Sequence, residues 1–98
     1  MKVAITPRAN EDLISIASYT YDTWGERQMQ TYMRAINARF EWLSENYRLG
    51  RQDERLDPAY FYVREGQHLI FYEVIGDAIF IIGIPHAAMD IPRYLGQE

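Results

Sequence analysis

Two stretches of the chain repeat apolar residues at intervals of three and four, which is the spacing of one face of an α-helix. They cover residues 7–24 and 26–46. Thr6 followed by Pro7 is a typical helix start, because the hydroxyl accepts a free backbone N–H and proline has none to leave unpaired. Gly25 separates the stretches almost without a linker. We therefore predict a tight antiparallel helical hairpin.

The second half of the chain changes to β-branched and aromatic residues with short polar breaks. Residues 59–64, 67–75 and 78–84 are predicted strands, separated by Glu65-Gly66 and Gly76-Asp77, which are typical of hairpin turns. Pro85 should end the last strand, and residues 2–5 form a predicted edge strand. The order β-α-α-β-β-β predicts an α+β fold with the helical hairpin packed on an antiparallel sheet, residues 1–98 forming a single domain.

Charge and composition narrow the expected partners. The chain has 98 residues with 10 basic and 14 acidic side chains, a net charge of −4. A negative charge disfavours non-specific nucleic-acid binding, so we expect no direct nucleic-acid partner. No apolar run approaches the roughly 20 residues that span a bilayer, and the N-terminus lacks a signal-peptide pattern. Together with the absence of cysteine, these features predict a cytoplasmic protein with no membrane partner.

A search for chemistry finds little. His68 and His86 are the only histidines, and too few ligands surround them in sequence for a metal site. We interpret both as hydrogen-bonded structural imidazoles. The serines lack the context of a nucleophile, and the glycines are scattered singly instead of forming a phosphate-binding loop. Charged residues on the outer helix faces, including Asp12 and Arg39, are interpreted as solvent-facing. The residues alone predict no catalytic site, metal or cofactor.

Short motifs spread over nearly the whole chain carry a family resemblance. The most specific are HLIFY at residues 68–72 and HAAMD at residues 86–90. The others are Thr6-Pro7-Arg8-Ala9, Asp12-Leu13 with Ile16, Tyr19, Trp24-Gly25, Gln28, Tyr32 and Leu49-Gly50-Arg51. In this order the motifs resemble the ParE toxins of bacterial toxin–antitoxin modules, within the RelE/ParE superfamily.

The resemblance implies a toxin without catalytic residues of its own. Such a toxin inhibits DNA gyrase by protein binding and is neutralised by a ParD-like antitoxin in a toxin–antitoxin hetero-oligomer. An amphipathic antitoxin segment wraps the hairpin and sheet in that family, which requires exposed apolar and aromatic anchors. The candidate antitoxin-binding residues are Tyr19, Trp24, Met29, Met33 and Tyr60. For the two methionines, core packing is the alternative interpretation.

The family uses its C-terminal segment for toxicity, which points to a second set of site residues. The candidate target-binding residues there are His86, Met89, Asp90, Arg93 and Tyr94. The resemblance thus separates an antitoxin-binding set on the hairpin and sheet from a target-binding set near the C-terminus.

Two alternative functions stay open. The first is a ribosome-dependent mRNA endonuclease of the RelE branch, which would need cationic groups and an acid–base pair. Its candidate groups are Arg51, Arg64, His86, Arg93 and Tyr94. The second is a non-toxic antitoxin-binding module, because Phe61 and Pro85 stand where the family often has arginine and leucine. The negative net charge favours gyrase inhibition over RNA cleavage.

Overall fold

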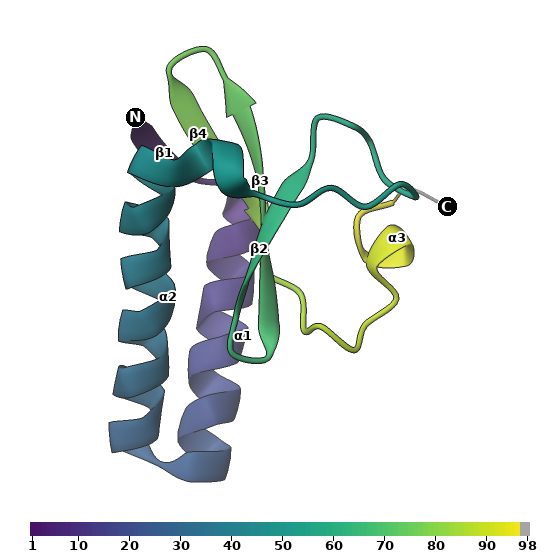
Figure 1. Cartoon of the computed structure of the whole chain (residues 1–98). Helices are drawn as coiled ribbons and strands as arrows, with labels where there is room; N and C mark the ends of the chain where they lie inside the picture. The colour runs from purple at the N-terminus through teal and green to yellow at the C-terminus, as the bar shows by residue number, and fades with distance from the viewer. Residues whose placement is uncertain (97–98) are drawn as a thin grey trace.

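The computed structural model describes residues 1–96 of the chain. Its elements are β1 (Lys2–Ile5), α1 (Pro7–Trp24), α2 (Glu26–Asn46), the 3-10 turn η1 (Tyr47–Leu49), β2 (Phe61–Glu65), β3 (His68–Ile75), β4 (Ala78–Gly83) and α3 (Ile91–Tyr94). The two long helices lie side by side and pack against one face of the sheet (Figure 1). The predicted α+β class and element order are confirmed. No helix within residues 1–96 is long and apolar enough to cross a membrane.

Local residue chemistry fixes both ends of α1. The Thr6 hydroxyl accepts the Ala9 N–H at 3.2 Å, as predicted for a helix cap, and it also donates to the Ile81 carbonyl at 2.7 Å. The helix cap is therefore tied to β4. At the other end, Gly25 has a φ of 91° and donates its N–H to the Tyr21 carbonyl. Because side chains rarely tolerate this φ, the sharp reversal between the helices depends on glycine.

The sheet has the strand order β1-β4-β3-β2, which makes β1 and β2 its two edges. The three later strands form the predicted antiparallel meander. The sheet is nevertheless mixed, since β1 pairs parallel with β4, from Lys2 opposite Ala78 to Ile5 opposite Ile81. The helical hairpin carries the chain across the sheet, and the meander then brings β4 back beside β1 in the same direction. Parallel pairing requires such a long connection.

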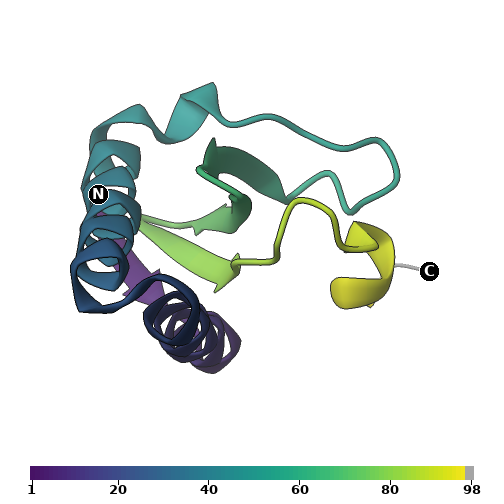
Figure 2. The same ribbon diagram turned by 90° about the horizontal axis from the view of Figure 1, so that it is seen from below.

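Hydrophobic clusters lie on both faces of the sheet. Ile70 and Tyr72 of β3 belong to the larger cluster, between the sheet and the helical hairpin. Phe71, which points to the opposite face, joins Leu56 and residues of the C-terminal segment in a smaller cluster. Figure 2 shows α3 and the loop before β2 on the side away from the long helices. The C-terminal segment is thus held by a core of its own.

Candidate functional site

Two adjoining hollows form one groove on the surface of the molecule. They have volumes of about 300 and 350 Å³ and share Tyr19, His68 and His86. The first hollow continues to Met89 and Tyr94 in the C-terminal segment, and the second continues along α1 to Trp24. We call the combined feature the histidine groove. Its walls come from α1, α2, the start of β3 and the segment after β4.

Two histidine side chains meet at the centre of the histidine groove. The rings of His68 and His86 are in edge-to-face contact with their centroids 5.4 Å apart. The Nδ1 of His68 lies 2.6 Å from the Tyr32 hydroxyl, and the Nδ1 of His86 accepts the Ala88 N–H at 3.0 Å. These contacts confirm the predicted hydrogen-bonded imidazoles. Burial, and then the neighbouring His86, lower the pKa of His68, which favours the neutral form of its ring.

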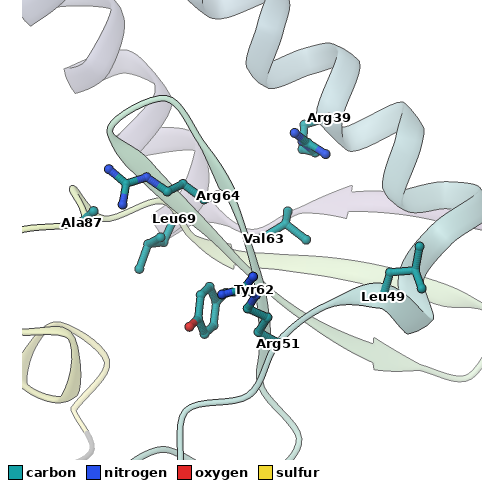
Figure 3. A pocket seen from close by; sticks show the side chains of 8 residues that line it. All are labelled: Arg39, Leu49, Arg51, Tyr62, Val63, Arg64, Leu69 and Ala87. Atoms are coloured by element: carbon teal, nitrogen blue, oxygen red, sulfur yellow. The ribbon is translucent and has the colours of Figure 1, made fainter.

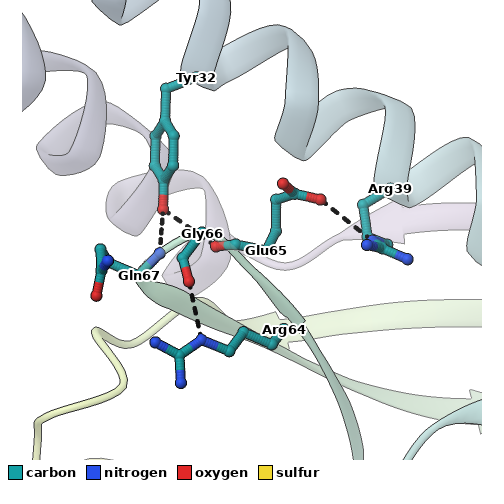
Figure 4. A network of polar contacts seen from close by, with 6 residues as sticks. All are labelled: Tyr32, Arg39, Arg64, Glu65, Gly66 and Gln67. Carbon is teal, nitrogen blue, oxygen red and sulfur yellow. Dashed lines mark hydrogen bonds and ion pairs between the residues drawn. The ribbon is translucent and has the colours of Figure 1, made fainter.

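Tyr32 connects α2 to the turn between β2 and β3. Its hydroxyl lies 3.1 Å from the Glu65 carbonyl and accepts the Gln67 N–H at 3.0 Å (Figure 4). Burial raises the pKa of Tyr32, which keeps the hydroxyl protonated. The side chain of Glu65 pairs with Arg39 of α2 at 3.2 Å. Arg39 is therefore partly exposed, as expected for an outer helix face, and it is also paired because the turn between β2 and β3 folds against α2.

Asp12 anchors the C-terminal segment to α1. Its carboxylate accepts the Ile84 N–H at 2.8 Å and the hydroxyl of Tyr94. The Arg8 guanidinium lies 4.0 Å from the centre of the Tyr94 ring and donates to the Tyr94 carbonyl. Burial, and then the Asp12 carboxylate, raise the pKa of Tyr94, which keeps its hydroxyl a donor. The solvent-facing interpretation of Asp12 is wrong, because distant residues fold back over this face of the helix.

The five candidate antitoxin-binding residues do not all lie together. Tyr19 and Trp24 are 68% and 70% exposed and line the histidine groove. Met33 is half-buried and packs against the larger cluster, as its core alternative predicts. Tyr60 packs against the smaller cluster, and Met29 is half-buried near the start of α2. Of the five candidates, only Tyr19 and Trp24 therefore line the histidine groove.

The candidate target-binding residues lie in the short helix α3 and in the segment just before it. His86, Met89 and Tyr94 line the histidine groove. Asp90 caps α3 by accepting the Arg93 N–H at 3.3 Å, and the Arg93 side chain is exposed. The structure thus places three of the five C-terminal candidates beside Tyr19, at the same groove that Trp24 lines, whereas Asp90 and Arg93 do not line it. Sequence spacing does not reveal this neighbourhood, because α1 and α3 lie at opposite ends of the chain.

A separate hollow, of about 500 Å³, lies beside β2 and holds some of the groups that RNA cleavage would need. Arg51 and Arg64 line it together with Arg39 of α2 (Figure 3), and we call it the arginine pocket. His86 and Tyr94, the candidate proton-transfer groups, line the histidine groove instead. Asp12 holds the Tyr94 hydroxyl there. Arg51 and Arg64 therefore line a different hollow from the candidate proton-transfer groups, and Arg93, the third cationic candidate, lines neither.

The fold and the histidine groove define a small α+β domain whose exposed aromatic groove is suited to binding another polypeptide. The ParE toxin family, described as the ParE toxin of the type II toxin–antitoxin system parDE, matches residues 3–91. The chain therefore belongs to the family of ParE toxins of type II toxin–antitoxin systems, as its sequence motifs predict.

Individual relatives match over almost their full length. The chain is 33% identical over 92 residues to Toxin ParE1 of Mycobacterium tuberculosis (strain ATCC 25618 / H37Rv), covering 93% of this chain and 94% of the relative. It is 34% identical to Toxin ParE1 of Caulobacter vibrioides (strain ATCC 19089 / CIP 103742 / CB 15), with coverages of 94% and 95%. A solved structure of the chromosomal ParDE TA system from P. aeruginosa matches with a TM-score of 0.75 at 21% identity, covering 88% of this chain and 95% of that one. At 21% identity, this structural match shows a shared fold alone.

Proposed function

We propose that the protein is a non-catalytic inhibitor of DNA gyrase that acts by protein–protein contact in the cytoplasm. In this proposal a ParD-like antitoxin neutralises it by binding in the histidine groove. Membership of the ParE toxin family supports both partners. The observation that carries the proposal is that Tyr19 and Trp24 line the same groove as His86 and Met89. An antitoxin segment bound there would cover His86 and Met89, which gives neutralisation a direct physical route.

The exposed aromatic residues of α1 supply the expected binding energy. Large aromatic side chains at an interface act as anchors that carry much of the affinity. Tyr19 and Trp24 remain mostly exposed in the isolated chain, so a partner that covers them gains apolar burial. The amphipathic helix of an antitoxin is suited to such a groove, because its apolar face meets the aromatic rings while its polar face stays in water.

Two assays with purified protein test the proposed target. Supercoiling by gyrase is measured in one, and cleavage of a labelled message on translating ribosomes in the other. We expect inhibited supercoiling and an intact message. Cleaved message with unaffected gyrase would contradict the proposal in favour of a RelE-type endonuclease. Inactivity in both assays, together with tight antitoxin binding, would indicate a non-toxic module.

Replacing Trp24 tests the antitoxin-binding part. Trp24→Ala is expected to weaken antitoxin binding by about 2 kcal/mol, measured by isothermal titration calorimetry, because it removes a large, exposed aromatic anchor. Tyr21→Ala is the matched control, since Tyr21 is also an exposed aromatic residue of α1 (54%) but does not line the histidine groove. A dissociation constant that Trp24→Ala leaves unchanged in a folded protein would reject the anchor role.

A further inference from the structure

The outer edge of β2 has an open backbone position. Within residues 1–96, β2 is an edge strand and its outer side meets an isolated bridge, in which Arg51 and Tyr62 exchange two N–H···O bonds of 2.9 Å. Alternate residues of a strand point their backbone groups the same way, so the N–H and C=O of Arg64 face this edge. Leu69, opposite Arg64, donates its N–H to the Pro85 carbonyl, which agrees with that direction.

The segment that carries Arg51 covers the edge of β2 at Tyr62 but turns away before it reaches Arg64. An antiparallel continuation of the bridge would place Leu49 opposite Arg64, but Leu49 belongs to η1 and its side chain is 64% exposed. The arginine pocket occupies the position that this segment leaves. It is lined by Val63 from the face of β2 that packs on the larger cluster, and by Tyr62 and Arg64 from the opposite face. A hollow that wraps both faces of an edge strand leaves room for another strand segment.

The charges around this position are unbalanced. Arg39 reaches the pocket from α2, Arg64 from β2, and Arg51 from the segment after η1 that bridges to β2 (Figure 3). Arg39 is paired with Glu65. In the part of the chain that the structure describes, no carboxylate pairs with Arg51 or Arg64, and Arg64 uses its Nε to bond the Gly66 carbonyl at 2.9 Å. Two unpaired guanidinium groups on a chain of net charge −4 form a local site for carboxylates.

We propose that the arginine pocket binds an extended acidic peptide segment of a partner protein, which adds a short strand to the edge of β2. The backbone of this segment pairs with the N–H and C=O of Arg64, and its carboxylates pair with the guanidinium groups of Arg51 and Arg64. Addition of a strand to an exposed sheet edge is an established mode of peptide recognition. The inference does not depend on the occupant of the histidine groove or on gyrase.

The chemistry of the pocket favours a peptide over a nucleic acid. A peptide supplies both the acceptor and the donor that complement the backbone of Arg64, whereas a phosphodiester supplies only acceptors. Leu49, Val63 and Leu69 give the lining an apolar part that accommodates an aliphatic side chain. The net charge of −4 also repels a long polyanion. An arginine-rich edge that merely prevents aggregation would bind neither ligand tightly.

Fluorescence anisotropy on the full chain tests the charge requirement. The probe is a labelled hexapeptide, blocked at both ends, in which glutamate alternates with valine. Arg51→Ala and Arg64→Ala are each expected to lower its affinity about tenfold, because each removes a charge-assisted hydrogen bond. Arg34→Ala is the control, since Arg34 is exposed on α2 and does not line the pocket. A glutamine-for-glutamate peptide should bind at least tenfold more weakly than the probe.

Backbone pairing is tested separately. In an added strand, every second amide N–H of the peptide faces β2 and the others face away. N-methylation of the amides that face β2 should abolish binding, and N-methylation of the others should leave the affinity unchanged. Hydrogen exchange followed by NMR should show the Arg64 amide gaining protection in the complex. Equal affinity in the arginine variants, equal binding of the glutamine peptide, or an unprotected Arg64 amide would overturn the proposal. Tighter binding of a single-stranded RNA decamer than of the glutamate peptide would also overturn it.

Discussion

His68 lies between Tyr32, on its Nδ1 side, and the edge-to-face ring of His86. Burial and this second imidazole lower its pKa below 6.5, with only Asp12 acting in the opposite direction. The unfolded chain therefore takes up the proton more readily than the folded protein. The stability that neutral His68 contributes is complete above about pH 6.5 and is lost as the pH falls toward the folded-state pKa. We expect the free energy of unfolding, measured in urea, to fall as the pH is lowered below about 7.

A substitution identifies His68 as the source of this dependence. His68→Gln keeps an acceptor for the Tyr32 hydroxyl but cannot titrate, so most of the pH dependence in this range should disappear. His86→Gln should retain it in weaker form, because the neighbouring imidazole is the second cause of the lowered pKa and burial the first. The same slope of stability against pH in the wild-type protein and in His68→Gln would contradict the assignment.

The two turns that join β2, β3 and β4 each contain a glycine, and the effects of replacing the two glycines can be compared directly. Gly66 and Gly76 have φ values of 56° and 61°. A Cβ added at Gly66 would lie 2.5 Å from Cε1 of Tyr32, whereas one added at Gly76 would meet nothing within 4 Å. Tyr32 cannot move away freely because its hydroxyl is bonded to the turn and lies against His68. Gly76→Ala should therefore cost about 1 kcal/mol from the backbone alone, and Gly66→Ala about 2–3 kcal/mol.

Urea unfolding of the two glycine variants measures this difference. Equal losses of stability would show that Tyr32 does not hold the β2–β3 turn in place. The comparison controls for the φ penalty, since both glycines follow a strand and begin a hairpin turn in the same meander.

Elements were predictable from sequence where their signals are local, and pairings between distant segments were not. Thr6, the helical stripes and the turn glycines act within a few residues, so the helix and strand positions agree closely with the structure. The parallel pairing of β1 with β4 depends on segments far apart in the chain. The site follows the same rule: the exposure of Trp24 was expected, but its place at one groove with Met89 was not. Tyr60 shows the converse, since an aromatic residue chosen as an anchor packs against the smaller cluster.

Across the whole molecule, α1 fixes the position of α3 by a side-chain hydrogen bond. Tyr94 of α3 donates its hydroxyl to Asp12 of α1, across 82 positions of sequence. Tyr94→Phe removes this donor but keeps the ring beneath Arg8, and Asp12 keeps the Ile84 N–H. We expect a loss of about 1–2 kcal/mol in unfolding free energy. The Leu95 amide, bonded to the Ile91 carbonyl, should exchange faster because the C-terminal segment opens more often.

The hydrogen bond between Tyr94 and Asp12 also allows gyrase inhibition and antitoxin binding to be tested separately. Tyr94→Phe loosens the segment that carries His86 and Met89 but leaves Tyr19 and Trp24 on an intact α1. Under the proposed function it should therefore weaken gyrase inhibition more than antitoxin binding, as measured by supercoiling inhibition and calorimetry on the same preparation. Tyr21→Phe, at an exposed position outside the histidine groove, should change neither quantity. If Tyr94→Phe weakens both by the same factor, the C-terminal segment and α1 act as one binding surface, and the antitoxin contacts must extend to α3.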